Sequence, residues 1–223
     1  MSRPDQIVQS VFHHQGQTLR VPSDDWLTLF ETEGFAAAIF DCDGTLVDST
    51  QAHFHAMQSA AQEQEQEMTA DWYAARTGLD RRTLFAEFRA ATEDTFDVED
   101  AIATSIKRFH KFTHLIKPIP QVVKFAAALR QHRIPLAVAT NAERDVARAS
   151  LSKVKATTLF DHIVSISDDV RPKPTPDMFE RAAHLLGQPA YKTLVLEDSR
   201  QGVQAAILAG MSAIQLLDDE EEP

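Results

Sequence analysis

A short apolar run that ends at two aspartates constrains the fold of this chain more than any other stretch. Residues 36–40, with the sequence AAAIF, are followed directly by Asp41 and, two positions later, by Asp43. Such a run is too short for a membrane span, but it suits a strand that is buried on both faces of a parallel sheet. Ligands of open parallel sheets bind beyond the carboxyl ends of the strands. Because residues two apart in an extended segment point the same way, we expect both carboxylates to face one crevice.

After residue 118 the chain alternates strand-like apolar runs with helical periodicity. This alternation predicts an α/β fold with a doubly wound, Rossmann-like parallel sheet and right-handed crossovers. Polar residues recur where two of the expected strands end, at Thr140 and Asn141 and at Glu197 and Asp198. Their recurrence supports a site at the carboxyl edge of the sheet. The expected strands are 134–140, 162–166, 193–197 and 213–217, and the expected helices are 121–132, 143–153, 176–186 and 200–209.

Residues 49–117, which follow the first strand, have helical periodicity and no strand-like alternation. An apolar stripe is the clearest feature, and we expect roughly four helices in this segment. The chain therefore divides into a core domain of residues 35–48 and 118–217 and an inserted helical cap domain of residues 49–117. The stripe consists of Ile102, Ile106, Phe109, Thr113 and Ile116.

Two terminal segments lie outside these domains. Residues 1–34 are polar with short apolar pieces, and we expect a hairpin or a loose arm whose role the sequence does not reveal. Residues 218–223 form an acidic tail that we expect to be disordered.

The charge of the chain argues against several classes of partner. The formal net charge is -11 at pH 7, and no run of five or more Lys or Arg residues occurs, which disfavours nucleic-acid and anionic-membrane surfaces. No apolar run reaches about 18 residues, so we expect no membrane span. The single cysteine, Cys42, cannot form an internal disulfide and fits a reducing compartment. We therefore expect a cytoplasmic protein that is a monomer or a weak homodimer.

Residues 41–49, DCDGTLVDS, resemble the first motif of the haloacid dehalogenase (HAD) superfamily of phosphatases and phosphomutases, with the signature hhhhDxDGTLxDS. The resemblance implies that Asp41 is a nucleophile that accepts a phosphoryl group and that Asp43 is a general acid and base. It also implies a HAD core with an α-helical cap inserted after this motif, in the place of residues 49–117. Dehalogenases of the superfamily lack the second aspartate, so Asp43 separates this chain from them.

Thr140 and Asn141 resemble the second HAD motif, a Thr or Ser at a strand end followed by Asn. The resemblance implies that Thr140 donates a hydrogen bond to the transferring phosphoryl group and that Asn141 lies in the substrate site. The same stretch fits a Thr-x-x-Glu capping box that ends at Glu143. Both roles can coexist, because phosphate oxygens bind at helix N-termini.

The loop of residues 171–177, RPKPTPD, resembles the third HAD motif, KPxPD. The resemblance implies that Lys173 neutralises the phosphoryl group and the nucleophile. Pro172 stands where family members often have Gly. Thr175 followed by Pro176 predicts the N-cap and the first residue of a helix.

Residues 197–211 resemble the fourth HAD motif and its trailing helix, EDSxxGVxAAxxAGM. The resemblance implies that Asp198, with Glu197 behind or beside it, holds Mg²⁺ together with Asp41 and the backbone carbonyl of Asp43. Ligand sets made only of oxygen favour Mg²⁺ over zinc. Four converging carboxylates repel one another by roughly 3 kcal/mol per pair at about 5 Å and an effective dielectric constant near 20. The ion and a neighbouring lysine offset most of this repulsion.

Two stretches of the expected cap bear on the substrate. His53 lies in the sequence DSTQAHFHAM, which is similar to a helix start of β-phosphoglucomutase and related sugar phosphatases, in which a His faces the site. The alternative is a His on the apolar face of its helix. Residues 77–81, TGLDR, resemble the substrate-specificity loop of the cap, in which Gly78 allows close approach and Arg81 grips an anionic or polyhydroxyl substrate. The same residues also fit a plain link between helices with a C-cap glycine.

Three functions follow, in order of expectation. The first is a Mg²⁺-dependent phosphatase that hydrolyses a small phosphorylated metabolite, above all a sugar phosphate, through an aspartyl phosphate on Asp41. The second is a phosphomutase similar to β-phosphoglucomutase. In that family a Ser and a Lys after the second motif help to hold a second phosphate. This chain has Ala142 and Glu143 at those positions, which counts against the mutase. The third is a non-catalytic binding module on a HAD scaffold, which only the presence of residues 1–34 supports.

Overall fold

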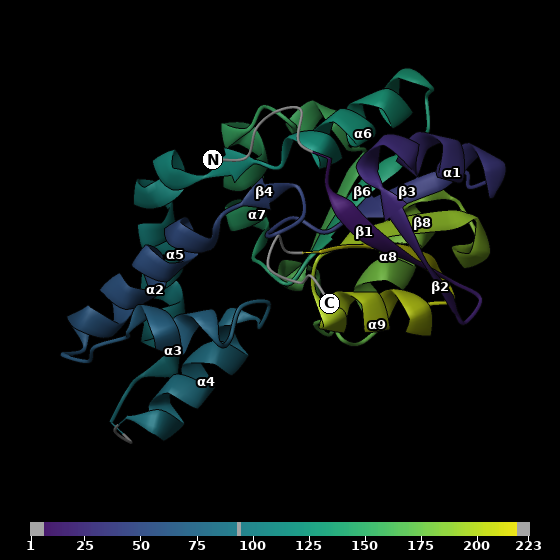
Figure 1. Cartoon of the computed structure of the whole chain (residues 1–223). Helices are drawn as coiled ribbons and strands as arrows, with labels where there is room; N and C mark the ends of the chain where they lie inside the picture. Colours follow the sequence, from purple (N-terminus) through teal and green to yellow (C-terminus); the bar gives the residue numbers. More distant parts are fainter. Residues whose placement is uncertain (1–6, 93–94, 218–223) are drawn as a thin grey trace.

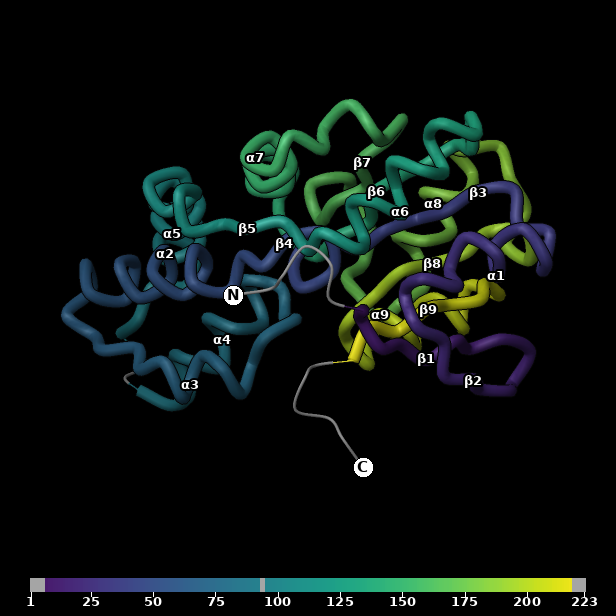
Figure 2. Tube along the Cα trace, turned by 45° about the horizontal axis from the view of Figure 1, so that its top comes forward, coloured from purple at the N-terminus to yellow at the C-terminus, as the bar shows by residue number. Residues whose placement is uncertain are grey.

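The protein consists of a sheet-based core and a helical cap that lie side by side (Figure 1). The computed structural model describes residues 7–92 and 95–217. Two short strands, β4 (Val47–Asp48) and β5 (Lys117–Pro118), carry the chain from the core into the cap and back. They pair with each other in antiparallel register between the two lobes (Figure 2). The expected acidic tail, residues 218–223, lies outside the described residues.

The described part of the core contains a seven-stranded sheet with the order β2-β1-β9-β8-β3-β6-β7. Strands β9, β8, β3, β6 and β7 run parallel, whereas β1 and β2 pair antiparallel at one edge. The predicted parallel α/β sheet is confirmed, with strand ends shifted by at most two residues. The strands are β1 (Gln9–His14), β2 (Gln17–Pro22), β3 (Ala37–Phe40), β6 (Leu136–Thr140), β7 (His162–Ser165), β8 (Thr193–Glu197) and β9 (Ser212–Leu216).

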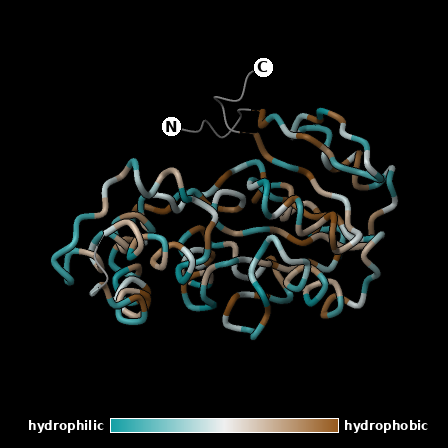
Figure 3. Tube along the Cα trace, turned by 90° about the horizontal axis from the view of Figure 1, so that it is seen from below, coloured by the Kyte–Doolittle hydropathy of each residue, from teal (hydrophilic) through white to brown (hydrophobic). Residues whose placement is uncertain are grey.

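Helices cover both faces of this sheet. Successive residues of β3 serve opposite faces: Ala38 and Phe40 belong to an apolar cluster with residues of α1, α6 and α7, whereas Ala37 and Ile39 belong to one with residues of α8 and α9. All four side chains are fully buried, and hydrophobic segments lie mainly inside the core (Figure 3). The core helices are α1 (Trp26–Thr32), α6 (Pro120–Gln131), α7 (Arg144–Lys153), α8 (Asp177–Leu186) and α9 (Arg200–Leu208), and the short 3₁₀ turns are η1 (Ser23–Asp25), η2 (Thr113–Leu115), η3 (Thr157–Leu159), η4 (Ile166–Asp168) and η5 (Ala190–Lys192).

The described part of residues 1–34 adds a hairpin and helix α1 to the core. Strand β1 pairs with β9 and so extends the sheet, and β2 forms its edge. Residues 15–16 both have positive φ, 49° and 78°, which suits a two-residue hairpin turn. The fully buried Trp26 donates from Nε1 to Ser10 Oγ at 3.0 Å, and the Ser10 hydroxyl donates to the carbonyl of Val21. A hairpin was one of the two forms that the sequence predicts here.

Four α-helices make up the described part of the cap, as the periodicity predicts. The predicted apolar stripe begins on α5 and continues beyond it. Phe109 of α5 and Ile116, which follows η2, are buried, and Ile106 packs against the same core cluster. A separate apolar cluster holds α2, α4 and α5 together within the cap. Within residues 7–92 and 95–217, no helix combines the length and the apolar composition that crossing a membrane requires. The cap helices are α2 (Thr50–Glu63), α3 (Ala70–Ala74), α4 (Arg81–Ala91) and α5 (Val98–Phe112).

Two predicted helix caps are wrong. Glu143, and not Thr140, is the N-cap residue of α7, and the two side chains do not form a capping box because the Glu143 carboxylate contacts the cap domain instead. Helix α8 begins at Asp177, and the Thr175 hydroxyl donates to backbone carbonyls of its own loop rather than capping the helix. In both cases a tertiary or loop contact takes the side chain that the local pattern assigns to a helix end.

Candidate active site

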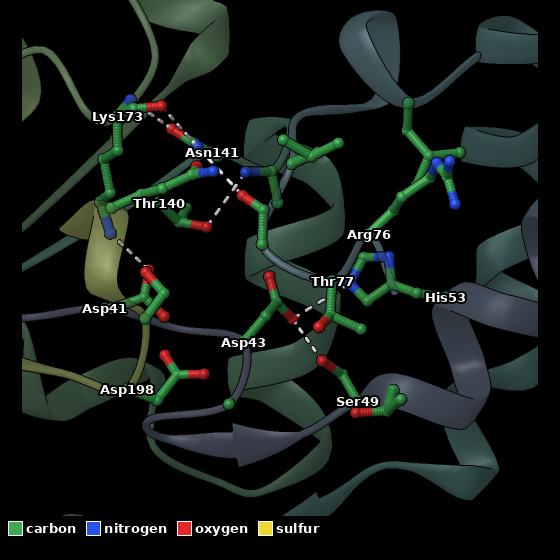
Figure 4. A pocket seen from close by; sticks show the side chains of 18 of the residues that line it. Asp41, Asp43, Ser49, His53, Arg76, Thr77, Thr140, Asn141, Lys173 and Asp198 are labelled. Atoms are coloured by element: carbon green, nitrogen blue, oxygen red, sulfur yellow. Dashed lines mark hydrogen bonds and ion pairs between the residues drawn. The ribbon is translucent and has the colours of Figure 1, made fainter. Parts of the chain in front are cut away.

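A cavity of about 590 Å³ is lined by residues of both the core and the cap. Every site residue that the sequence predicts lies in its wall, so the fold brings together positions from 41 to 198. Figure 4 shows several of these side chains converging from the strand ends and from helix α2. The predicted residues are Asp41, Asp43, His53, Gly78, Arg81, Thr140, Asn141, Lys173, Glu197 and Asp198.

Asp41 follows β3 and forms a buried ion pair with Lys173. Lys173 Nζ donates to Asp41 Oδ1 and to Glu197 Oε1, both at 2.6 Å, and the first of these bonds is drawn in Figure 4. Lys173 is only 5% exposed, so the two carboxylates and not solvent balance its charge. Burial by itself lowers the pKa of Lys173, but the charges of Asp41 and Glu197 outweigh burial and hold that pKa above its ordinary value.

Asp41, Glu197 and Asp198 form an acidic cluster at the ends of β3 and β8. One carboxylate oxygen from each residue lies within 4.8 Å of the others. Burial raises the pKa of Asp41 well above its ordinary value, and the two acidic neighbours add to the rise, against the lowering by Lys173. Burial and the charge of Glu197 raise the pKa of Asp198 to about 7. Crowded oxygen ligands of this kind fit a hard divalent cation, which offsets their repulsion.

Glu197 supports this cluster from behind. Its Oε1 accepts from Lys173, and its Oε2 accepts from the backbone N–H and the hydroxyl of Ser199 at 2.8 and 2.9 Å. The Thr45 hydroxyl donates to Asp198 Oδ1 at 3.1 Å. Sequence reasoning gave no role to Ser199 or Thr45, although both lie inside the motifs that it used. Their position beside the acidic residues of those motifs is the signal that could have identified them.

The Asp43 carboxylate is not part of the acidic cluster and instead contacts the start of the cap. Its Oδ1 accepts from Ser49 Oγ at 2.5 Å and from His53 Nε2 at 3.1 Å (Figure 4). Burial raises the pKa of Asp43, but the interaction with His53, the Ser49 hydrogen bond and the charge of Arg81 outweigh burial and leave that pKa below its ordinary value. The sequence assigns only the backbone carbonyl of Asp43 to a metal, so this placement leaves the side chain for proton transfer.

His53 and Arg81 connect Asp43 to the rest of the cap and to the core. Arg81 Nη2 lies 3.2 Å from His53 Nδ1. Because a guanidinium can only donate, His53 Nδ1 accepts here and Nε2 donates to Asp43. Arg81 Nε donates to Glu143 Oε2 at 2.7 Å. The sequence left open whether His53 and Arg81 face the cavity; both line it. It missed Glu143 as a cap contact.

Thr140 and Asn141 lie at the end of β6, opposite the cap loop. Thr140 Oγ1 accepts from the backbone N–H of Ala142 at 3.0 Å, which leaves the hydroxyl proton for another acceptor. Asn141 Oδ1 accepts from the backbone N–H of Lys173 at 2.9 Å, and its Nδ2 donates to the carbonyl of Gly78 at 3.4 Å. Asn141 therefore fixes the Lys173 loop and touches the cap.

Comparisons with known proteins agree with this architecture. Residues 38–216 match the family described as haloacid dehalogenase-like hydrolase. The chain is 28% identical over 183 residues to the phosphorylated carbohydrates phosphatase of Thermotoga maritima, with 80% of this chain and 83% of that protein covered. It is 29% identical over 195 residues to the fructose-1-phosphate phosphatase YqaB of Escherichia coli, with 82% and 97% covered.

A solved structure extends the comparison to the fold. The chain superposes on the crystal structure of CbbY from Rhodobacter sphaeroides in complex with phosphate with a TM-score of 0.73 and 24% identity, covering 79% of this chain and 84% of that chain. The family match spans the cap and every cavity residue from Asp41 to Asp198. On this evidence the chain belongs to the haloacid dehalogenase-like hydrolases.

Proposed function

We propose that the protein is a Mg²⁺-dependent phosphatase that hydrolyses a small phosphorylated metabolite, a sugar phosphate, through an aspartyl-phosphate intermediate. The observation that carries this proposal is the contact of Lys173 with Asp41, because it places a buried cation beside a buried strand-end carboxylate in a cavity between core and cap. The reactions named for the two relatives, on phosphorylated carbohydrates and on fructose 1-phosphate, support the substrate class. The enzyme is then a phosphoric monoester hydrolase, and its single cysteine suits work in the cytoplasm.

The acidic cluster suits the metal. In this proposal Asp41, Asp198 and the backbone carbonyl of Asp43 hold Mg²⁺, and Glu197 stands behind them with its oxygens engaged by Lys173 and Ser199. When bound, Mg²⁺ neutralises carboxylate charge and stabilises the negative charge on the phosphoryl oxygens.

The residues of the chain divide the reaction between them. Asp41 attacks phosphorus in line, a bond forms between its carboxylate oxygen and phosphorus, and the bond from phosphorus to the sugar oxygen breaks. Asp43 gives its proton to the departing alkoxide and then takes one from the water that hydrolyses the aspartyl phosphate. Lys173 balances the charge of the phosphoryl oxygens, and the Thr140 hydroxyl proton is directed to one of them.

Contacts from the start of the cap bear on the protonation state of Asp43. In the structure Ser49 and His53 both donate to Asp43, an arrangement that suits the ionised, water-activating form of this residue. Both bonds end at Oδ1, so Oδ2 carries the proton in the first step, and the loss of the negative charge weakens both bonds. His53 lies on the cap helix α2, so movement of the cap on substrate binding changes the contact between His53 and Asp43. In this proposal that movement converts Asp43 between its ionised and its protonated form.

A phosphomutase is the second candidate, and one contact disfavours it. A mutase must hold a second phosphate while its intermediate waits, whereas here the Glu143 carboxylate extends toward the cap and pairs with Arg81. A non-catalytic binding module is the third candidate, and the intact set of Asp41, Asp43 and Lys173 disfavours it.

Release of inorganic phosphate from a panel of sugar phosphates, with Mg²⁺ and with EDTA, tests the proposal. We expect release that depends on Mg²⁺, and a full rate in EDTA would refute the metal assignment. Glucose 1-phosphate supplied with glucose 1,6-bisphosphate should yield inorganic phosphate without accumulation of glucose 6-phosphate. Accumulation of the isomer would establish the mutase instead, and no product from any ester would favour the binding module.

A further inference from the structure

Arg81 is an unusual cation because it is buried and pairs across the two lobes. The residue is 4% exposed and lies at the first position of the cap helix α4. Its Nε donates to Glu143 Oε2 at 2.7 Å, and Glu143 is the N-cap residue of the core helix α7. The two side chains are 3% and 17% exposed, so water screens their interaction little.

Within residues 7–92 and 95–217, one of the three guanidinium nitrogens of Arg81 has no partner. Arg81 Nη2 is used by His53, and Nη1 is buried without a hydrogen-bond partner among the described residues. Because Arg81 lines the cavity, this buried donor lies beside the space that a bound molecule would occupy. The charge behind this donor is already balanced by Glu143. Such a group suits an uncharged oxygen, for example a sugar hydroxyl, better than a dianion.

We propose that Glu143 is a specificity-determining residue, which neutralises Arg81 and thereby restricts the enzyme to esters that carry one phosphate and an uncharged, hydroxyl-rich remainder. This inference rests on the proposed phosphatase function. A second phosphate on the cap side of the cavity meets a neutralised arginine, the Glu143 carboxylate and the Asp43 carboxylate, so its desolvation is not compensated. A monophosphate places its dianion at Lys173 and its hydroxyl groups near Arg81 Nη1.

A second arginine of the cavity provides a matched control. Arg76 also lines the cavity and pairs with a glutamate, Glu87, at 2.9 Å. That glutamate is 48% exposed, so solvent screens the pair and its removal changes the field in the cavity little. The two pairs therefore have the same chemistry and differ in burial.

The experiment compares fructose 1-phosphate with fructose 1,6-bisphosphate, which differ by one phosphate. For the wild type, we expect kcat/KM to favour the monophosphate by about 100-fold or more. E143Q should reduce this preference by about tenfold or more through a lower KM for the bisphosphate. The reason is that the charge of Arg81, no longer neutralised, attracts the second phosphate. E87Q should keep the wild-type preference. E143D, which keeps the charge, should lie nearer to wild type than E143Q does.

Binding without turnover gives the second readout. In an Asp41→Asn background, calorimetry should show at least about tenfold tighter binding of the bisphosphate when E143Q is added, and little change for the monophosphate. Equal wild-type kcat/KM for the two esters, or an unchanged preference in a folded E143Q, would overturn the inference while leaving a phosphatase. Absence of phosphate release from either ester would instead count against the proposed function, and the calorimetric comparison would still decide the role of Glu143.

Discussion

Gly202 lies so close to Glu197 that a Cβ atom added to it would stand 1.8 Å from Oε1 of that carboxylate. Glu197 is 1% exposed and holds Lys173, so it has no open space into which to retreat. The fourth motif therefore needs glycine at this position because any side chain would collide with the carboxylate that binds Lys173. The backbone conformation does not require glycine here, because Gly202 lies inside helix α9.

Replacing Gly202 by Ala should damage catalysis more than stability. Alanine favours a helix interior over glycine by about 1 kcal/mol, but its methyl group displaces Glu197 and with it Lys173. We expect kcat/KM to fall by about 100-fold or more, since misplacing one charged group of an active site by about 1 Å costs that much. Far-UV circular dichroism should remain native. Gln204→Ala, on the exposed face of the same helix, is the control. Normal activity of folded G202A would contradict the assignment of Glu197.

Asp43→Asn should separate proton transfer from nucleophilic attack. General acid-base catalysis contributes about 10² to 10⁴ in rate, so we expect kcat on sugar phosphates to fall by that factor. Asp41→Asn should leave no measurable turnover, because no aspartyl phosphate can form. Mass spectrometry of quenched D43N reactions should detect phosphorylated Asp41, whose hydrolysis has lost its base. Comparable activity in D43N and wild type would assign proton transfer to another group.

Without metal, the protein should lose stability as the pH rises from about 4 to about 7. The pKa of Asp198 is about 7 in the folded protein and about 4 in an unfolded chain. A raised folded pKa gives stability that is present at low pH and lost as the pH passes through the folded value. The raised pKa of Asp41 acts in the same direction, and the lowered pKa of Asp43 acts only below about pH 4.

Thermal unfolding in EDTA measures this effect. We expect Tm to fall by about 3 °C or more over that range, which corresponds to about 1 kcal/mol in a protein of this size. Asp198→Asn should flatten the profile, and added Mg²⁺ should raise Tm most at pH 8, where the carboxylates are ionised. A profile of D198N as steep as that of wild type would show that other groups govern the dependence.

The contact between helix α1 and the N-terminal hairpin should be needed for stability. Trp26 is fully buried and bonds Ser10 of β1, so Trp26→Ala removes a large core side chain and a hydrogen bond together. We expect the free energy of unfolding to drop by about 3–5 kcal/mol, against about 1 kcal/mol for Ser10→Ala. Urea unfolding of both variants gives the comparison. A loss below about 1 kcal/mol for W26A would mean that the contact of α1 with the hairpin contributes little to stability.

Short-range patterns were sufficient for much of this protein. The apolar run before Asp41, the alternation after residue 118 and the strand-end polar residues predicted the parallel sheet and the shared edge at which Asp41, Thr140 and Asp198 lie. These features depend on neighbours within a few residues. Burial on both faces selects a continuous apolar strand, and parallel strands necessarily bring their carboxyl ends to one edge.

Tertiary structure alone decided the contacts between distant side chains. Thr140 and Glu143 fit a local capping box, yet Glu143 pairs with Arg81, 62 positions away, because a buried guanidinium requires a counter-charge more than a helix end requires a cap. Likewise, nothing local in the hairpin specifies that β1 pairs with β9 at the far end of the chain. Strand partners and buried ion pairs depend on which surfaces come into contact in the folded protein. Local sequence patterns do not specify contacts between residues that are far apart in the chain.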